Sequence, residues 1–191
     1  MVTPAATRAC RPLPAGRSSR SVEVRTFRFC PWCGGPLVEP VGERQDCAQC
    51  GEPSYLNPKP TASAILVDDA GRVLLGRRAI EPHLGLWDTP GGFTRPGESL
   101  EECVRRELRE EAGVEVEVGR LVTTVPDFYG DTGEATVNAF YECRVLSGDP
   151  HPDDDVAELR WFERDALPLP EELAFDGVRS ALAAWLSGPR P

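Results

Sequence analysis

The chain has 191 residues, with 21 lysines and arginines against 31 aspartates and glutamates, so its formal net charge is −10 at pH 7. This length suffices for one ordinary hydrophobic core with a small additional module. The acidic balance disfavours a nucleic-acid-binding role, which needs clustered positive charge. No apolar run reaches the roughly 18 residues of a transmembrane helix. We therefore expect a soluble, cytoplasmic protein with a small-molecule substrate and no nucleic-acid or membrane partner.

The first 26 residues form an arginine-rich segment in which proline, alanine and serine are frequent and the first acidic residue is Glu23. Such a composition cannot bury a core. We predict a disordered tail over residues 1–26. Two alternatives are an overlong gene start and an organellar transit peptide, which is rich in arginine and poor in acids. The second alternative would move the protein from the cytoplasm to an organelle.

Two CxxC pairs follow the tail, Cys30 with Cys33 and Cys47 with Cys50, separated by 13 residues and each followed by glycine. Glycine suits the tight turn whose backbone N–H groups point at thiolate sulfurs. Four thiolates form a closed tetrahedral Zn²⁺ site, which is structural rather than catalytic. The pattern resembles a zinc ribbon over residues 27–57. Disulfides, redox motifs and a site that has lost its metal are the alternatives.

Neither the charge of the ribbon nor the cysteines outside the two CxxC pairs indicate a further functional site. Between Arg28 and Lys59 there are three basic and four acidic residues, which argues against a nucleic-acid clamp. Cys10 is interpreted as a tail thiol, and Cys103 and Cys143 as buried packing residues.

Beyond the ribbon, strands and two helices are predicted, which implies a mixed sheet between helices. The turn at residues 68–71 should join the first two strands as a hairpin. An amphipathic helix over 176–186 should close the chain. The predicted strands cover residues 61–67, 72–78, 87–91, 116–125, 135–145 and 158–162.

The other helix should begin near Ser99 and end at Gly113. Ser99 and Glu102 have the spacing of a capping box, and Pro96-Gly97 forms a turn that cannot continue a helix from upstream. Gly113 can adopt the positive φ that ends a helix. Apolar residues recur every four positions between these ends, which predicts a stripe that packs on the sheet.

Three carboxylates share one face of this helix, because Glu107 precedes Glu110 by three residues and Glu111 by four. Three anions so close repel each other unless a cation lies among them. Hard oxygen ligands favour Mg²⁺ or Mn²⁺, which also bind substrate phosphates. The pattern indicates hydrolysis of a phosphate compound. The alternative is a solvated acidic helix face.

The segment resembles the Nudix box without departure at any fixed position. The resemblance implies a Nudix-type α/β/α sandwich of α+β class over residues 58–191. It also implies Mg²⁺ ligands at Glu107, Glu110, Glu111 and the Gly92 carbonyl, and an ion pair between Glu98 and Arg106. The matching positions are Gly92, Glu98, Arg106, Glu107, Leu108, Glu110, Glu111, Gly113 and Val114.

The box implies hydrolysis of a nucleoside diphosphate linked to another group and leaves that group open. The motifs CPWCGG, NPKP, LLGRRAIEPHLGLWDTPGGF and ELAFDGVRSAL are similar to those of ribbon-bearing FAD and ADP-ribose pyrophosphatases, which release AMP. NADH is disfavoured because residues 115–145 lack the Ser-Gln-Pro-Trp array of NADH pyrophosphatases. Nucleoside triphosphate hydrolysis and a non-catalytic nucleotide sensor are alternatives. The resemblance also suggests a homodimer.

Substrate contacts are predicted outside the box. Phe128 or Tyr129 should stack on a base, and one of Arg77 and Arg78 should bind a phosphate or ribose, because strand alternation points only one of them inward. Phe175 is ambiguous between core and ligand contact. The general base is open, with candidates in Glu107 of the box, in Glu134 and in the acidic loop 153–155.

Overall fold

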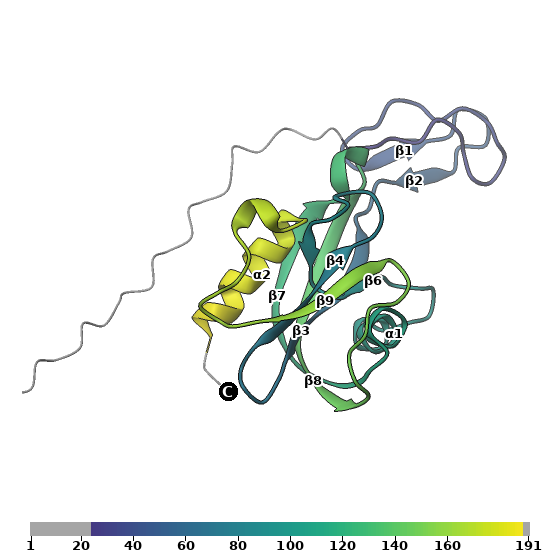
Figure 1. Ribbon diagram of the computed structural model, residues 1–191. Helices are drawn as coiled ribbons and strands as arrows, with labels where there is room; N and C mark the ends of the chain where they lie inside the picture. The colour runs from purple at the N-terminus through teal and green to yellow at the C-terminus, as the bar shows by residue number, and fades with distance from the viewer. Residues whose placement is uncertain (1–23, 189–191) are drawn as a thin grey trace, which may run out of the picture.

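The computed structural model describes residues 24–188. Most of the predicted tail, including Cys10, lies outside these residues. The described chain forms a seven-stranded sheet that lies between two helices (Figure 1). It also forms a separate, small two-stranded sheet. The predicted α/β/α sandwich is confirmed. No helix in the described part is long and apolar enough to cross a membrane.

The large sheet is mixed, as predicted. Its main path runs β5-β4-β3-β8-β7, while β6 also pairs with β3 and β9 with β4. The β3 and β8 strands are parallel and every other pair is antiparallel. The strands are β3 (Lys59–Val67), β4 (Val73–Arg78), β5 (Trp87–Asp88), β6 (Gly91–Phe93), β7 (Glu115–Phe128), β8 (Ala135–Ser147) and β9 (Val156–Phe162).

The two faces of the sheet carry separate cores, because alternate side chains of β3 point in opposite directions. Ala64 and Leu66 pack with the helix α1 (Leu100–Ala112), together with the buried Cys103 and Cys143. Ile65 and Val67 pack with the helix α2 (Asp176–Ser187). The packing roles predicted for Cys103 and Cys143 are therefore confirmed.

The predicted ends of α1 are also confirmed. The Ser99 side chain accepts from the Glu102 N–H, and the Glu102 side chain accepts from the Ser99 N–H, which completes the capping box. Gly113 caps the other end in the left-handed conformation, with φ 67°. These local signals fix where the helix begins and ends.

Two strands differ from the sequence prediction. The β7 strand continues to Phe128, three residues beyond the predicted strand 116–125. Pairing with β8 as far as Ala135 explains the extension. The predicted strand 87–91 is divided, because β5 pairs with β4 whereas β6 pairs with β3.

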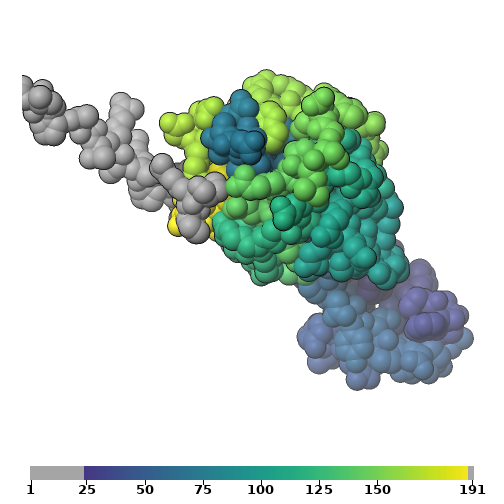
Figure 2. Space-filling model, turned by 90° about the horizontal axis from the view of Figure 1, so that it is seen from below, coloured from purple at the N-terminus to yellow at the C-terminus, as the bar shows by residue number. Residues whose placement is uncertain are grey.

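The ribbon contains the strands β1 (Arg44–Asp46) and β2 (Pro53–Tyr55), which the sequence prediction missed. Figure 2 shows these residues, in purple to blue, as a lobe that projects from the body of the protein. Short 3-10 turns occur at Gly130–Thr132 and Pro170–Glu172. The first of these is tied to the chain that enters the ribbon, because the Arg25 N–H donates to the Gly133 carbonyl at 2.8 Å.

Candidate active site and metal centres

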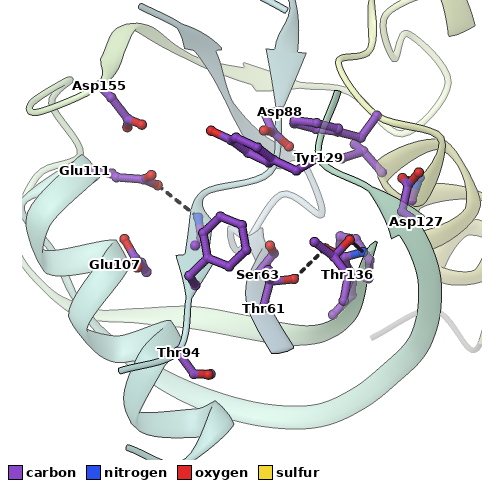
Figure 3. Close-up of a pocket in the computed structure, with 18 of the residues that line it drawn as sticks. Thr61, Ser63, Asp88, Thr94, Glu107, Glu111, Asp127, Tyr129, Thr136 and Asp155 are labelled. Atoms are coloured by element: carbon purple, nitrogen blue, oxygen red, sulfur yellow. Dashed lines mark hydrogen bonds between the residues drawn. The ribbon is translucent and has the colours of Figure 1, made fainter. Parts of the chain in front are cut away.

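A cavity of about 460 Å³ opens where α1, the sheet and α2 meet. Figure 3 shows acidic side chains on one side of it and hydroxyl-bearing and other polar side chains on the other. We call the first group the acidic end and the second the polar floor. The acidic end comprises Gly92, Glu107, Glu110, Glu111 and Asp155. The polar floor comprises Thr61, Asp127, Thr136 and Asn138.

Arg106 organises the acidic end. Its guanidinium donates two bonds to Glu98, at 2.8 and 2.9 Å, so the expected ion pair is present and ties the loop before α1 to the helix. The same group donates to Glu107 at 2.6 Å and to Glu110 at 3.0 Å. Hydrogen bonds from Arg106 lower the pKa of Glu98 to about 2. Glu98 therefore stays ionised and holds Arg106 against the helix.

Gly92 lies against Glu107 so closely that no side chain fits between them. A Cβ on Gly92 would be 2.4 Å from the Glu107 Oε1 atom. The backbone of β6 and a helix carboxylate thus form a cradle of hard oxygen donors, which is what Mg²⁺ or Mn²⁺ requires. The residues present fit such an ion, although their ligand roles remain predictions.

Glu111 is the most buried member of the acidic end. Its carboxylate accepts from the Gly91 N–H at 2.9 Å. Burial first, and then the charges of Asp155 and Glu107, raise the pKa of Glu111 well above its ordinary value. A divalent cation would relieve this repulsion, which is a second reason why the site suits one.

The loop between β8 and β9 is fastened to the end of α1. Backbone N–H groups of His151 and Asp153 donate to the carbonyls of Ala112 and Glu111, both at 3.1 Å. The His151 ring also covers Gly113, where a Cβ would be 2.0 Å from the ring. This attachment places Asp155 beside Glu111, as Figure 3 shows. No role for His151 was predicted from the sequence.

The structure distinguishes among the predicted candidates for the general base. Glu107, Asp154 and Asp155 line the cavity, whereas Asp153 does not. Glu134 is also absent from the lining and forms an ion pair with Lys59. The geometry leaves Glu107, Asp154 and Asp155 as the candidates at the cavity, of which Glu107 and Asp155 belong to the acidic end.

Four aromatic side chains that line the cavity form what we call the aromatic wall: Phe93, Phe128, Tyr129 and Phe175. The rings of Tyr129 and Phe175 are nearly parallel, with an interplanar angle of 19° and centroids 5.9 Å apart. Phe93 meets Tyr129 edge to face at 5.3 Å. Phe128 also lines the cavity. The predicted aromatic pair therefore lies at the cavity, and Phe175 joins it.

Arg78 lines the cavity and Arg77 does not. Arg77 forms an ion pair with Glu158 and lies over the Trp87 ring, so the cavity geometry gives no support to a substrate contact there. Arg78 donates to Asp88 at 3.0 Å and to the Pro82 carbonyl at 2.7 Å.

The Arg78 guanidinium also lies 5.2 Å from the centre of the Phe175 ring. With its donors directed to protein atoms, Arg78 supports the aromatic wall more than it presents a free cation to a phosphate.

The four ribbon cysteines form a separate candidate metal centre. Their sulfur atoms all lie within 4.8 Å of one another, and no other set of three or more ligand groups among the described residues is so close. Backbone N–H groups of Cys50 and Gln49 help to lower the pKa of Cys47 to about 6. Gly34 and Gly51 adopt positive φ, as the predicted turns require. The cluster is compatible with a zinc ribbon.

The polar floor was not predicted from the sequence. Its members come from β3, β7 and β8 and follow no fixed spacing along the chain. Alternation of polar residues within strands, as at Thr136 and Asn138, was the only available signal, and it is common on solvated strands.

Comparison with known proteins defines the class first. A family model described as the NUDIX domain matches residues 57–184, which is well over half of the chain. The chain belongs to the NUDIX family, as its box indicated.

Among curated proteins, it is 32% identical over 174 residues to the NAD-capped RNA hydrolase NudC of Stutzerimonas stutzeri, covering 88% of this chain and 60% of that relative. The chain thus spans about three-fifths of the relative's length.

Solved structures agree on the fold. A NUDIX hydrolase from Nitrosomonas europaea has a TM-score of 0.71 and 28% identity, covering 84% of this chain and 90% of that chain. The NUDIX domain of Shewanella oneidensis NrtR, complexed with ADP ribose, has a TM-score of 0.52 and 29% identity. That match covers 68% of this chain and 87% of the NrtR chain.

Proposed function

We propose that the protein is a pyrophosphohydrolase that cleaves a nucleoside diphosphate linked to another group. One observation carries this proposal: the box carboxylates, the Gly92 backbone and Arg106 meet in a single cavity with an aromatic wall beside them. The acidic end suits metal-assisted attack of water on a pyrophosphate, and the rest of the cavity has room for a nucleoside. A solvated acidic helix face would have neither the cradle at Gly92 nor the buried Glu111.

Each group at the acidic end has a proposed role. Gly92, Glu107, Glu110 and Glu111 would hold Mg²⁺ or Mn²⁺. When bound, the ion neutralises charge on the phosphate oxygens and lowers the pKa of the attacking water. Burial raises the pKa of Glu107, which makes it a better proton acceptor at neutral pH. Asp155, at the same end of the cavity, is another group placed to accept the proton.

The proposed substrates are adenine dinucleotide-like compounds, FAD or ADP-ribose, with AMP as a product. The sequence similarity to pyrophosphatases of these compounds supports the choice, as does a structural neighbour that binds ADP ribose. A substrate of this kind would place its pyrophosphate at the acidic end and a base against Tyr129 and Phe175.

Hydrolysis of NAD(H), either free or as an RNA cap, is a second candidate. The relatives named as NAD-capped RNA hydrolases favour it. The missing Ser-Gln-Pro-Trp array and the acidic balance of the chain disfavour it. Whether RNA is a partner therefore depends on the substrate.

A hydrolysis panel with products resolved by chromatography tests the function. The panel holds FAD, ADP-ribose, NADH, NAD-capped RNA and nucleoside triphosphates, each with and without Mg²⁺. AMP with FMN, or AMP with ribose 5-phosphate, would support the leading proposal. Release of NMN and 5′-monophosphate RNA from the capped RNA would support the second candidate. Binding of ADP-ribose without turnover by folded, Mg²⁺-supplied protein would instead indicate a sensor.

We further propose that the ribbon binds one structural Zn²⁺ and that the protein forms a homodimer. The cysteine geometry supports the metal, and only the family resemblance supports the dimer. Zinc analysis of purified protein and of Cys47→Ser would test the first, with one equivalent expected in the wild type and a loss in the variant. Light scattering would test the second.

A further inference from the structure

The polar floor is assembled by strand register at the end of the cavity away from the box. Thr61 on β3 lies directly beside Asn138 on the parallel strand β8. Thr136, two residues before Asn138, lies opposite Asp127 on the antiparallel strand β7. Side chains two residues apart on a strand, and side chains directly opposite across a ladder, share one face. The four polar groups therefore point to the same side of the sheet.

Asn138 presents an acceptor to this end of the cavity. Its amide nitrogen donates to the Val125 carbonyl and to the Thr136 hydroxyl, both at 3.1 Å, so both N–H groups are used. The contact with a backbone carbonyl also fixes the amide orientation, because a carbonyl cannot donate. The amide oxygen accepts from the Thr61 hydroxyl and keeps a second lone pair.

Asp127 adds acceptors beside the amide. Its carboxylate accepts from the Gly177 N–H at 2.7 Å and from the Phe128 N–H at 2.8 Å. A carboxylate has about four acceptor positions, so roughly two are free for a ligand. A Cβ on Gly177 would meet both Asp127, at 3.0 Å, and Asn138, at 3.7 Å, so these groups converge at the start of α2.

The aromatic wall lies next to the polar groups at the start of α2. Tyr129 follows Asp127 by two residues along the chain, and Phe175 precedes Gly177 by two. A base that stacks on these rings would bring one edge to the polar floor. That edge would meet mainly acceptors, with the Thr136 hydroxyl as the available donor.

We propose that the polar floor reads the base of the substrate and selects one with an exocyclic amino group, adenine over hypoxanthine. This inference rests on the proposed function, because it assigns the base-binding end of the same cavity. A 6-keto oxygen would face the lone pairs of Asp127 and Asn138, and a desolvated polar group without a partner is costly. Asp127 and Asn138 thus determine base specificity and do not touch the reacting phosphates.

Product binding tests the inference without requiring turnover. The full-length protein is titrated calorimetrically with AMP, IMP and purine riboside 5′-monophosphate. These ligands carry an amino group, a keto group and no substituent, respectively, at position 6 of the purine. AMP should bind about tenfold or more tightly than IMP, the factor that corresponds to one lost hydrogen bond. Equal affinity for AMP and IMP would overturn the inference.

The matched variant is Asp127→Asn, which keeps the side-chain shape and an oxygen for the Gly177 N–H, loses the acceptor for the Phe128 N–H and offers a donor to the cavity. It should reduce the AMP preference to less than about threefold. The control is Asp131→Asn, the same change at an exposed residue outside the cavity lining. An unchanged preference in a folded Asp127→Asn protein would sink the role of Asp127.

The inference and the proposed function can fail separately. Preference for AMP in a protein that hydrolyses nothing would leave the polar floor assignment standing and contradict the proposed function. Equal hydrolysis of ADP-ribose and IDP-ribose, with equal binding of AMP and IMP, would support the proposed function and overturn the base assignment.

Discussion

The two ends of the cavity are built in different ways. Apart from Asp155, the acidic end comes from one continuous segment, residues 92–114, whose members are placed by a capped helix and the loop before it. The polar floor comes from three strands and converges with the start of a distant helix. The acidic end can therefore be recognised from local spacing, whereas the polar floor exists only after the sheet has formed.

This difference has a consequence for mutations. Changes at the acidic end should affect the chemical step, because its groups surround the proposed site of attack. Changes at the other end should affect which substrate binds and how tightly. Kinetic measurements that separate kcat from KM can therefore distinguish the two ends.

The largest effect is expected for Glu111→Gln. Loss of this carboxylate should lower Mg²⁺-dependent hydrolysis by about 10²- to 10³-fold or more. Glu117→Gln, at an exposed position on β7, is the matched control and should retain activity. Full activity in Glu111→Gln would contradict its assignment as a metal ligand.

The stability of the same variant should change in the opposite direction. Because the folded-state pKa of Glu111 is raised, its ionisation costs stability as pH rises above the ordinary value of 4.5. At neutral pH without divalent cations, Glu111→Gln should therefore melt at the same or a higher temperature than the wild type. A clearly lower melting temperature would show that the carboxylate is needed for folding.

A smaller effect is expected for Gly113→Ala. The position has φ 67° and its Cβ would collide with His151, so the change should cost about 1–3 kcal/mol of unfolding free energy. Denaturant titration measures this cost. In a Gly113→Ala/His151→Ala double variant, the part due to the collision should be recovered. If the double variant recovers nothing, backbone strain alone accounts for the glycine.

Arg78→Met should raise KM about tenfold with little change in kcat. The variant removes the support of Phe175 and leaves the carboxylate of Asp88, whose pKa burial raises to about 6, without its partner. Arg77→Met is the control, because Arg77 does not line the cavity. Melting curves should accompany the kinetics, since both variants lose an ion pair. A tenfold fall in kcat instead would place Arg78 at the reacting phosphate.

The smallest effect is expected for Glu98→Gln and appears in the pH dependence of stability. Arg106 depresses the folded-state pKa of Glu98 to about 2, below the ordinary value of 4.5. The stabilisation is therefore present above pH 4.5 and is lost as pH falls through that window towards 2. Glu98→Gln should flatten this part of the stability profile. A slope identical to that of wild type would show that the ion pair does not stabilise the fold.

The sequence predicted the features that depend on local chemistry. The ends of α1, the hairpin of β3 and β4 and the packing of Cys103 followed from capping, turn and periodicity rules. The length of β7 and the division of residues 87–93 into two strands did not, because neighbouring strands decide them. Likewise, strand alternation indicated that only one of Arg77 and Arg78 faces inward, but it could not say which.

Long-range contacts account for the other residues that were missed. The His151 contact with Gly113 joins a loop to the end of a helix almost 40 residues earlier in the chain. The polar floor depends on contacts of the same kind, and its hydroxyl and amide groups resemble an ordinary polar strand face until their partners are known.

A competition assay with ADP-ribose and IDP-ribose, in one mixture with and without Mg²⁺, tests both ends of the cavity together. The account predicts that hydrolysis requires the metal and that AMP forms about tenfold or more faster than IMP. Folded protein that releases neither product in the presence of Mg²⁺ would contradict the proposed chemistry. Equal rates of AMP and IMP release would contradict the division of the cavity into a reacting end and a base-selecting end.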